Sequence, residues 1–481
     1  MSNGSSPTTA CKKKLYALNP KAPAAPTLLT QRTSRRQRRE PADPASLQRQ
    51  VRQLLADKIS GNQVGIWLLV PEHLRLGTWD LLRGWADAPP EALAPRLALQ
   101  IVHEAALCRI NLRCGRTLSQ KGFEVANGLP WVASDQAIHD LLEARPVATT
   151  ASLQVALGKL RQASGHFDGS LLVIDPHRIQ SYTQRQMRRH RGHGDAKPSK
   201  QAQTFFCLDA RTAQPIAFTL ASGARTVTQA TPELLGLVQQ ILCLPNPTPA
   251  PPLVLADEEH YTGELFDKVR ALPFDLLMPM RATRQQREGW NRLPPEHFQR
   301  HWAGYAIHKT PYRFGAGDAV ALIQRSGEQA GAYDFKGFLS TRDRDELEQL
   351  SVEFPQRWHV EEFFKGNQAL GWQRAGTLNL NIRYGQMTLA LVAQAVIHQL
   401  RQRLGAPYQT WDALHLSTGL FGALEGDVRV QEDTILVTYY NAPNTPLLRE
   451  HYQDLPRKLQ AAGVDPRVPW LYDFKLDFRF K

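Results

Sequence analysis

Two short apolar runs in the middle of the chain each end in an aspartate. Ser170–Ile174 precede Asp175, and Pro252–Ala256 precede Asp257. An apolar run of four to eight residues is typical of a strand buried inside a sheet. The chain must therefore build a sheet in which two acidic side chains follow buried strands.

Further strands and helices are predicted around these aspartates. Thr204–Asp209 and Pro215–Leu220 predict two strands joined by a turn, and Pro232–Leu242 predicts an amphipathic helix. A helix over Gly263–Ala271 and a short strand over Asp275–Met278 come next. Three consecutive strands and then alternating helices and strands imply a mixed α/β sheet.

The chain has 481 residues, which is too long for one ordinary hydrophobic core. The pattern of apolar residues also changes along its length. The helical stretch near the N-terminus fits a helix-turn-helix-like DNA-binding unit, and it fits any small helical bundle equally well. We predict a disordered basic arm (1–45), a helical region that is a candidate DNA-binding domain (46–165), an α/β core (170–284 and 341–404), a β-rich insertion (285–340) and a C-terminal region (405–481).

The chain carries a net charge of +13 and has a pI of about 9.6. A basic excess of this size favours a polyanionic partner, with a nucleic acid first, although a basic enzyme with a merely soluble surface has the same charge. Arg188, Arg189 and Arg191 lie in a loop between the first two predicted strands, near Asp175. We expect this loop to bind the DNA backbone; the alternative is an ordinary exposed loop.

The cysteines and the longest uncharged stretch indicate the cellular compartment and whether the chain could span a membrane. The five cysteines are scattered, which argues against a disulfide framework and suits a reducing cytoplasm. Residues Tyr384–Leu400 carry no formal charge but contain several glutamines, and a spanning helix needs about 20 mostly apolar residues. We therefore predict a buried core helix there, no membrane partner and no signal peptide.

Asp175 and Asp257 are candidate ligands for a divalent metal ion. Two carboxylates from neighbouring strands can share hard cations such as Mg²⁺, which prefer oxygen ligands. The alternative is that each aspartate only caps the turn that follows its strand. His177 and His260 lie close by in sequence, but no regular ligand spacing supports zinc, and we expect them to be solvated or to contact phosphate.

A third acidic residue lies on a predicted helix that runs from Arg357 to about Leu370. At 100° per residue, Arg357, Glu361 and Lys365 fall on one stripe. The adjoining face is apolar and strongly aromatic, which suits a helix packed on a sheet with its polar stripe over the aspartates. The alternative is an exposed ladder of ion pairs.

The segment Arg-Trp-His-Val-Glu-Glu-Phe-Phe-Lys, residues 357–365, resembles the signature of the DDE-type transposases of bacterial insertion sequences. That signature is Tyr, two residues, Arg, three residues, Glu, six residues and Lys. Phe354, Arg357, Glu361 and Gln368 stand at these positions, so the Arg and the Glu match while the Tyr and the final Lys are replaced.

The resemblance implies a ribonuclease-H-like core with Asp175, Asp257 and Glu361 as a catalytic triad that binds two Mg²⁺ or Mn²⁺ ions. Arg357 and Lys365 would bind phosphates of the transposon end. The expected fold is thus a ribonuclease-H-like mixed sheet with a β-rich insertion, preceded by an all-helical N-terminal region.

The resemblance also implies an activity and partners. The enzyme would cleave double-stranded DNA at transposon ends and transfer the strands into target DNA, working as a homodimer in a synaptic complex in the bacterial cytoplasm, on the nucleoid. Two alternatives remain, a ribonuclease-H-like nuclease without strand transfer and an inactive DNA-binding relative.

Overall fold

The computed structural model describes residues 43–61, 63–109, 121–181, 186, 189–190, 197–222, 225–329, 332–372, 377 and 379–481. Residues 1–42, and with them nearly all of the predicted basic arm, lie outside this set, as do Arg188 and Arg191. The described residues belong to one folded unit that begins at residue 42.

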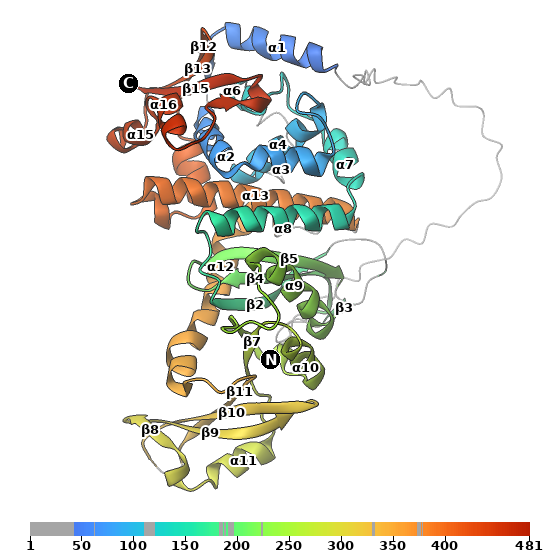
Figure 1. Ribbon diagram of the computed structural model, residues 1–481, viewed down its shortest axis with the longest axis vertical. Helices are drawn as coiled ribbons and strands as arrows, with labels where there is room; N and C mark the ends of the chain where they lie inside the picture. The colour runs from blue at the N-terminus through green and yellow to red at the C-terminus, as the bar shows by residue number, and fades with distance from the viewer. Residues whose placement is uncertain are drawn as a thin grey trace, which may run out of the picture. The chain divides into compact units, whose positions relative to one another are not determined.

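A mixed sheet at the centre of the chain confirms the predicted strand order (Figure 1). β4 (Ser199–Asp209) pairs antiparallel with both β2 (Leu171–Gln180) and β5 (Gln214–Ser222), while β6 (Leu253–Leu255) and β7 (Asp275–Pro279) run parallel to β2. Three antiparallel strands followed by two parallel ones, with the first strand in the middle, are the topology of a ribonuclease-H-like core.

Both faces of this sheet are buried. Leu171 and Val173 of β2 belong to one apolar core, and Leu172 and Ile174 belong to another, because successive side chains of a strand point to opposite faces. The second core also holds the apolar residues of α9 (Val227–Leu242) and α10 (Gly263–Arg270), and the first holds those of α12 (His359–Asn367) and α13 (Leu380–Leu404).

The predicted β-rich insertion is present and continues the core sheet. Its last strand pairs antiparallel with β7, so the order of strands runs on as β7-β11-β10-β9-β8. Its elements are α11 (Arg284–Asn291), β8 (Gln299–Trp302), β9 (Tyr305–Phe314), β10 (Gly317–Ser326) and β11 (Asp334–Ser340).

The prediction that the N-terminal region is wholly helical is wrong in one place. The three residues of β1 (Ile59–Gly61) pair with β12 near the C-terminus. A strand this short leaves no periodic pattern in the sequence, and its partner lies far along the chain. The second sheet has the order β1-β12-β13-β15-β14, with β12 (Gly426–Gln431), β13 (Thr434–Tyr439), β14 (Arg467–Val468) and β15 (Phe474–Phe480).

The N-terminal helices share one core with the C-terminal region. The hydroxyl of Tyr439 donates to the carbonyl of Val64, and the indole N–H of Trp470 donates to the carbonyl of Ala126. The helices of these two regions in the described ranges are α1 (Pro44–Ala56), α2 (Val70–Leu76), α3 (Thr78–Ala86), α4 (Leu93–Ala106), α6 (Lys121–Ala126), α7 (Asp135–Glu143), α8 (Val147–Ala163), α14 (Ala413–Leu416), α15 (Thr445–Tyr452) and α16 (Leu455–Ala461).

The uncharged stretch Tyr384–Leu400 forms most of α13 and is almost entirely buried, as predicted. Tyr384 packs on Phe218 of β5, with the ring centroids 5.2 Å apart. Among the helices in the described ranges, none is long and apolar enough to span a membrane.

Gly128 tests the contact between the N-terminal helices and the C-terminal region. Its φ is +67°, and a Cβ atom there would lie 2.2 Å from the carbonyl oxygen of Trp470. Gly77 has a similar φ of +63°, but no described atom lies within 4 Å of its Cβ position. We expect Gly128→Ala to lower the free energy of unfolding by about 2–4 kcal/mol and Gly77→Ala by about 1–2 kcal/mol. Urea unfolding followed by circular dichroism measures both, and equal losses would rule out the steric contact.

Candidate active site

Asp175 and Asp257 stand level on neighbouring parallel strands. β2 and β6 pair over three positions, the first joining Leu171 to Leu253, so that partners lie 82 residues apart along the chain. Asp257 also follows Asp175 by 82 residues, two positions beyond the last pair. By the alternation of the strands, both aspartates point to the sheet face that α12 covers.

Asp175 is not at the end of its strand, contrary to the prediction. β2 continues to Gln180 because β4 pairs with it along this stretch, with Phe206 opposite Asp175. The parallel pairing with β6, in contrast, ends near Asp175. The aspartate therefore has its backbone fixed on one side by β4 while the other side opens toward Asp257.

Asp257 caps the helical turn Glu258–His260, which holds one of its oxygens. Its Oδ1 accepts the backbone N–H of Glu259 at 3.1 Å and lies 2.5 Å from Nδ1 of His260. The His260 side chain is 1% exposed. Within the described residues no hydrogen bond reaches Oδ2 of Asp257, which leaves this oxygen for a ligand.

The charges around the two aspartates shift their pKa values in opposite directions. Burial and then the charge of Asp257 raise the pKa of Asp175 to about 8, and Glu361 adds to this while Arg357 and Arg178 oppose it. Burial alone would raise the pKa of Asp257, but His260, the N–H of Glu259 and the charge of Arg357 outweigh burial and lower the pKa. At neutral pH, in the absence of a cation, Asp175 therefore keeps its proton.

Glu361 lies on α12, in a helical segment that is less regular than predicted. Instead of one helix, tight turns at Phe354–Trp358 and Gln368–Leu370 flank α12. Arg357 still lies one turn before Glu361, with its Nη2 atom 3.5 Å from Oε1 of the glutamate.

The aromatic face of α12 brings Glu361 to the aspartates. The ring of Phe364 lies 4.3 Å from that of His177, stacked, and 5.3 Å from that of Phe206. His177 is two residues beyond Asp175 on β2, and Phe206 pairs with Asp175. The apolar face thus packs on the sheet as predicted, directly beside the first aspartate.

Two other basic residues predicted to bind DNA, Lys365 and Arg189, lie on the surface of the described structure. Lys365 is exposed, and its ammonium group lies 5.6 Å from the ring centroid of Trp358. Arg189 is exposed in the two-residue strand β3 (Arg189–His190), which pairs with β4. Among the members of this set that the structure describes, Arg357 is the one that contacts Glu361 and acts electrostatically on both aspartates.

The donor set suits a hard divalent cation. In the described part of the chain, no three His, Cys, Asp or Glu side chains are already gathered tightly enough to hold a metal ion, and Arg357 contacts Glu361 instead. The charges of Asp257 and Glu361 nevertheless raise the pKa of Asp175, so that ionising Asp175 has a cost in free energy. A dication with oxygen ligands would remove that cost, so the residues fit such an ion.

His260 and the pair Arg178–Glu259 were not predicted from the sequence. His260 is buried against Asp257, so the expectation that it is solvated or contacts phosphate is wrong. Arg178, three residues after Asp175, forms an ion pair with Glu259, two residues after Asp257. The pair ties the two aspartate-bearing segments together. The spacing of His260, three residues after Asp257 in a turn, is the one signal that could have revealed its role.

Comparison with known proteins identifies the class. Residues 166–395 match the family model of the transposase DDE domain. A solved structure of piggyBac transposase, in a synaptic complex with hairpin DNA, is similar with a TM-score of 0.40 and 10% sequence identity, over 74% of this chain and 79% of that chain. No curated protein sequence matches the chain.

The order and directions of the central strands are those of a ribonuclease-H-like fold. More specifically, residues 166–395 are a transposase DDE domain, the enzymatic domain of DNA transposition, as the signature around Glu361 predicted. Transposases of this family act on DNA and use divalent metal ions.

The raised pKa of Asp175 predicts a pH dependence of stability. The folded protein holds this proton up to about pH 8, whereas the unfolded chain loses it near about pH 4. The stabilising effect of the proton is complete below about pH 4 and is lost as the pH rises to 8. In the presence of a chelator, we expect wild type to lose about 1 kcal/mol or more relative to Asp175→Asn between pH 5 and 8.

Urea unfolding at several pH values measures this difference. Glu362→Gln, which changes an exposed carboxyl on the same helix as Glu361, is the matched control and should behave like wild type. Parallel curves for wild type and Asp175→Asn would contradict the raised pKa.

Proposed function

We propose that Asp175, Asp257 and Glu361 are the catalytic triad of this transposase and hold two Mg²⁺ or Mn²⁺ ions. The observation that carries the proposal is the register of β2 and β6, which sets Asp175 and Asp257 level on neighbouring parallel strands, with α12 packed beside Asp175 through Phe364. Two strands and a helix that are far apart in sequence thus meet on one face of the sheet. When bound, such ions activate a water nucleophile and stabilise the departing 3′ oxygen of a phosphodiester.

The residues around the triad have separate roles in this proposal. His260 and the N–H of Glu259 fix Oδ1 of Asp257, so that Oδ2 would be free to bind a cation. Arg357 acts electrostatically on both aspartates and contacts Glu361. A guanidinium in this place offsets the acidic cluster in the free protein and can donate to a phosphate oxygen of bound DNA.

The proposed DNA contacts extend beyond the triad. Lys365 and the loop residues Arg188, Arg189 and Arg191 would bind backbone phosphates, as would the basic arm (1–45) and the helical domain (46–165). The net charge of +13 supports this assignment, because neutralising phosphates releases condensed counterions.

Transposition joins two element ends to one target, and we propose that a homodimer holds those ends in a synaptic complex. Since the proposed substrate is double-stranded DNA, the proposed location is the bacterial cytoplasm, on the nucleoid.

Alanine substitutions test the triad. We expect Asp175→Ala, Asp257→Ala and Glu361→Ala each to reduce cleavage of a transposon-end duplex by at least about a thousandfold, because each removes a proposed metal ligand. Binding of the same duplex, measured by a mobility shift, should survive, since phosphate contacts are made elsewhere.

Glu362→Ala is the matched control, because Glu362 is the exposed neighbour of Glu361 on the same helix. It should cleave as wild type does. Normal cleavage by any of the three triad variants would contradict the proposed triad. If Glu362→Ala lost cleavage while Glu361→Ala cleaved normally, the third metal ligand would be Glu362 instead of Glu361.

A strand-transfer assay separates transposition from simple hydrolysis. A pre-cut duplex with a free 3′-OH is incubated with supercoiled plasmid, protein and Mg²⁺. We expect the 3′ end to become joined to the plasmid, and Asp257→Ala to give no joined product. Hydrolysis of intact ends without any joined product would instead favour a nuclease of the same fold.

A further inference from the structure

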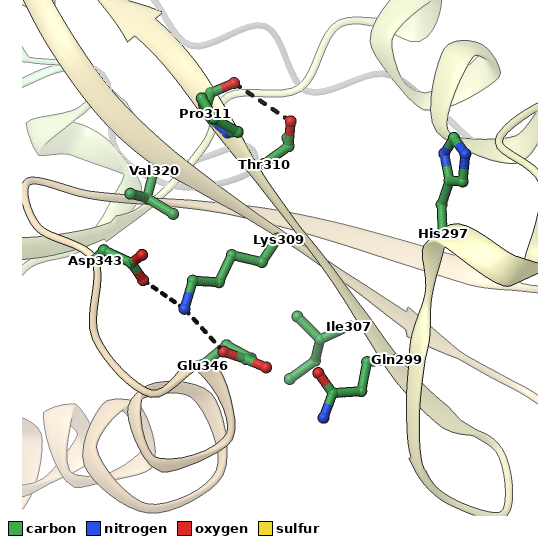
Figure 2. A pocket seen from close by; sticks show the side chains of 9 residues that line it. All are labelled: His297, Gln299, Ile307, Lys309, Thr310, Pro311, Val320, Asp343 and Glu346. Carbon is green, nitrogen blue, oxygen red and sulfur yellow. Dashed lines mark hydrogen bonds and ion pairs between the residues drawn. The ribbon is translucent and has the colours of Figure 1, made fainter.

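Lys309 joins the β-rich insertion to the segment that leads into α12. Its Nζ atom lies 2.5 Å from Oδ1 of Asp343 and 3.1 Å from Oε2 of Glu346, and it donates to the carbonyl of Arg344 at 2.9 Å. Figure 2 shows the ammonium group between the two carboxylates, in the wall of a pocket of the insertion. Lys309 belongs to β9, and all these partners belong to residues 341–347, which come directly after β11.

The same segment is also fastened to the core sheet. Arg342 and Arg344 both reach the buried carboxylate of Asp275 at the start of β7, at 3.3 and 3.2 Å. The backbone of Thr341 donates to the carbonyl of Leu276. Core contacts therefore hold one side of the segment, and Lys309 holds its other side from the insertion.

The segment leads directly toward the helix that carries Glu361. A π-helical turn at Glu348–Glu353 comes first. Such turns are rare in proteins overall, but many of those that occur lie at functional sites. Phe354 then packs on Phe338 of β11, with ring centroids 4.8 Å apart. Arg357 and Glu361 come within the next two turns, so a shift of residues 341–347 would be passed on to them.

Electrostatics make Lys309 the centre of this attachment. Asp343 and Glu346 are like charges three residues apart, and both turn to the same ammonium group. The hydrogen bond with Asp343, above all, raises the pKa of Lys309 despite its partial burial, so it stays charged. Without this cation the two carboxylates would repel each other and the segment would lose its tie to β9.

We propose that Lys309 is a positioning residue of the transposase, which fixes Arg357 and the helix of Glu361 through Asp343 and Glu346. The inference rests on the proposed role of Glu361 in the triad. The insertion thereby acquires a mechanical role, because β9 sets the place of a catalytic side chain although it contributes none itself.

The test compares Lys309→Met with Lys309→Arg and with Lys336→Met, which removes an exposed lysine from β11 of the same insertion. We expect Lys309→Met to lower kcat for end cleavage about threefold to tenfold with little change in KM, because a partly exposed ion-pair cluster has a modest energy. Lys309→Arg should restore kcat, and Lys336→Met should match wild type.

Hydrogen exchange supplies a readout that does not depend on activity. In Lys309→Met, amides of residues 348–358 should exchange several-fold faster than in wild type, while those of β2 and β6 stay unchanged. Exchange equal to wild type in residues 348–358, or faster exchange with an unchanged kcat, would overturn the proposal.

Two further arms keep the outcomes separable. If Lys309→Met does not fold, the double variant Asp343→Asn/Glu346→Gln removes the two carboxylates that pair with Lys309. It must give the same kcat and exchange results. If wild-type protein fails to cleave DNA and the triad is wrong, the exchange experiment still decides whether Lys309 orders the segment.

Discussion

The parallel pairing of β2 with β6 is the interaction on which the rest of the site depends. It spans only three residue pairs, yet it sets Asp175 and Asp257 at the same level of the sheet. The apolar side chains that precede them are buried on both faces and fix this register, because a shift by one residue would turn every side chain to the wrong core. Burial of the sheet thus holds together two carboxylates that would otherwise separate.

Local patterns in the sequence were enough to find the sheet. The apolar runs before Asp175 and Asp257, the intervening strands and the insertion could all be predicted because each is a property of consecutive residues. The length of β2 could not, since its second half is held by β4 rather than by its own composition. For the same reason β1 was missed: three residues become a strand only beside β12.

The residues of the site also fall into those that the sequence could predict and those that only the fold brings together. The spacing of Arg357 and Glu361 on one helix was readable, and the structure places them 3.5 Å apart. The pairing of Arg178 with Glu259, and of Lys309 with Asp343, joins positions that only the fold brings together. His260 lay within reach of a local argument, but its burial, which decides its role, is a property of the packed turn. Sequence patterns therefore predicted the acidic groups, and the tertiary structure adds the groups that contact them.

The pairing of β11 with β7 has a consequence for the behaviour of the protein in a crowded cell. Without the insertion, β7 would be an edge strand with a row of unpaired backbone groups, an open template for association with other chains. β11 covers that edge, and the sheet ends instead at β8, a strand of four residues that includes Arg300 and lies mostly exposed. Short, charged outer strands resist edge-to-edge aggregation. The insertion thus moves the open edge of the sheet from the buried, apolar core strands to a strand that is poorly suited to recruit another molecule.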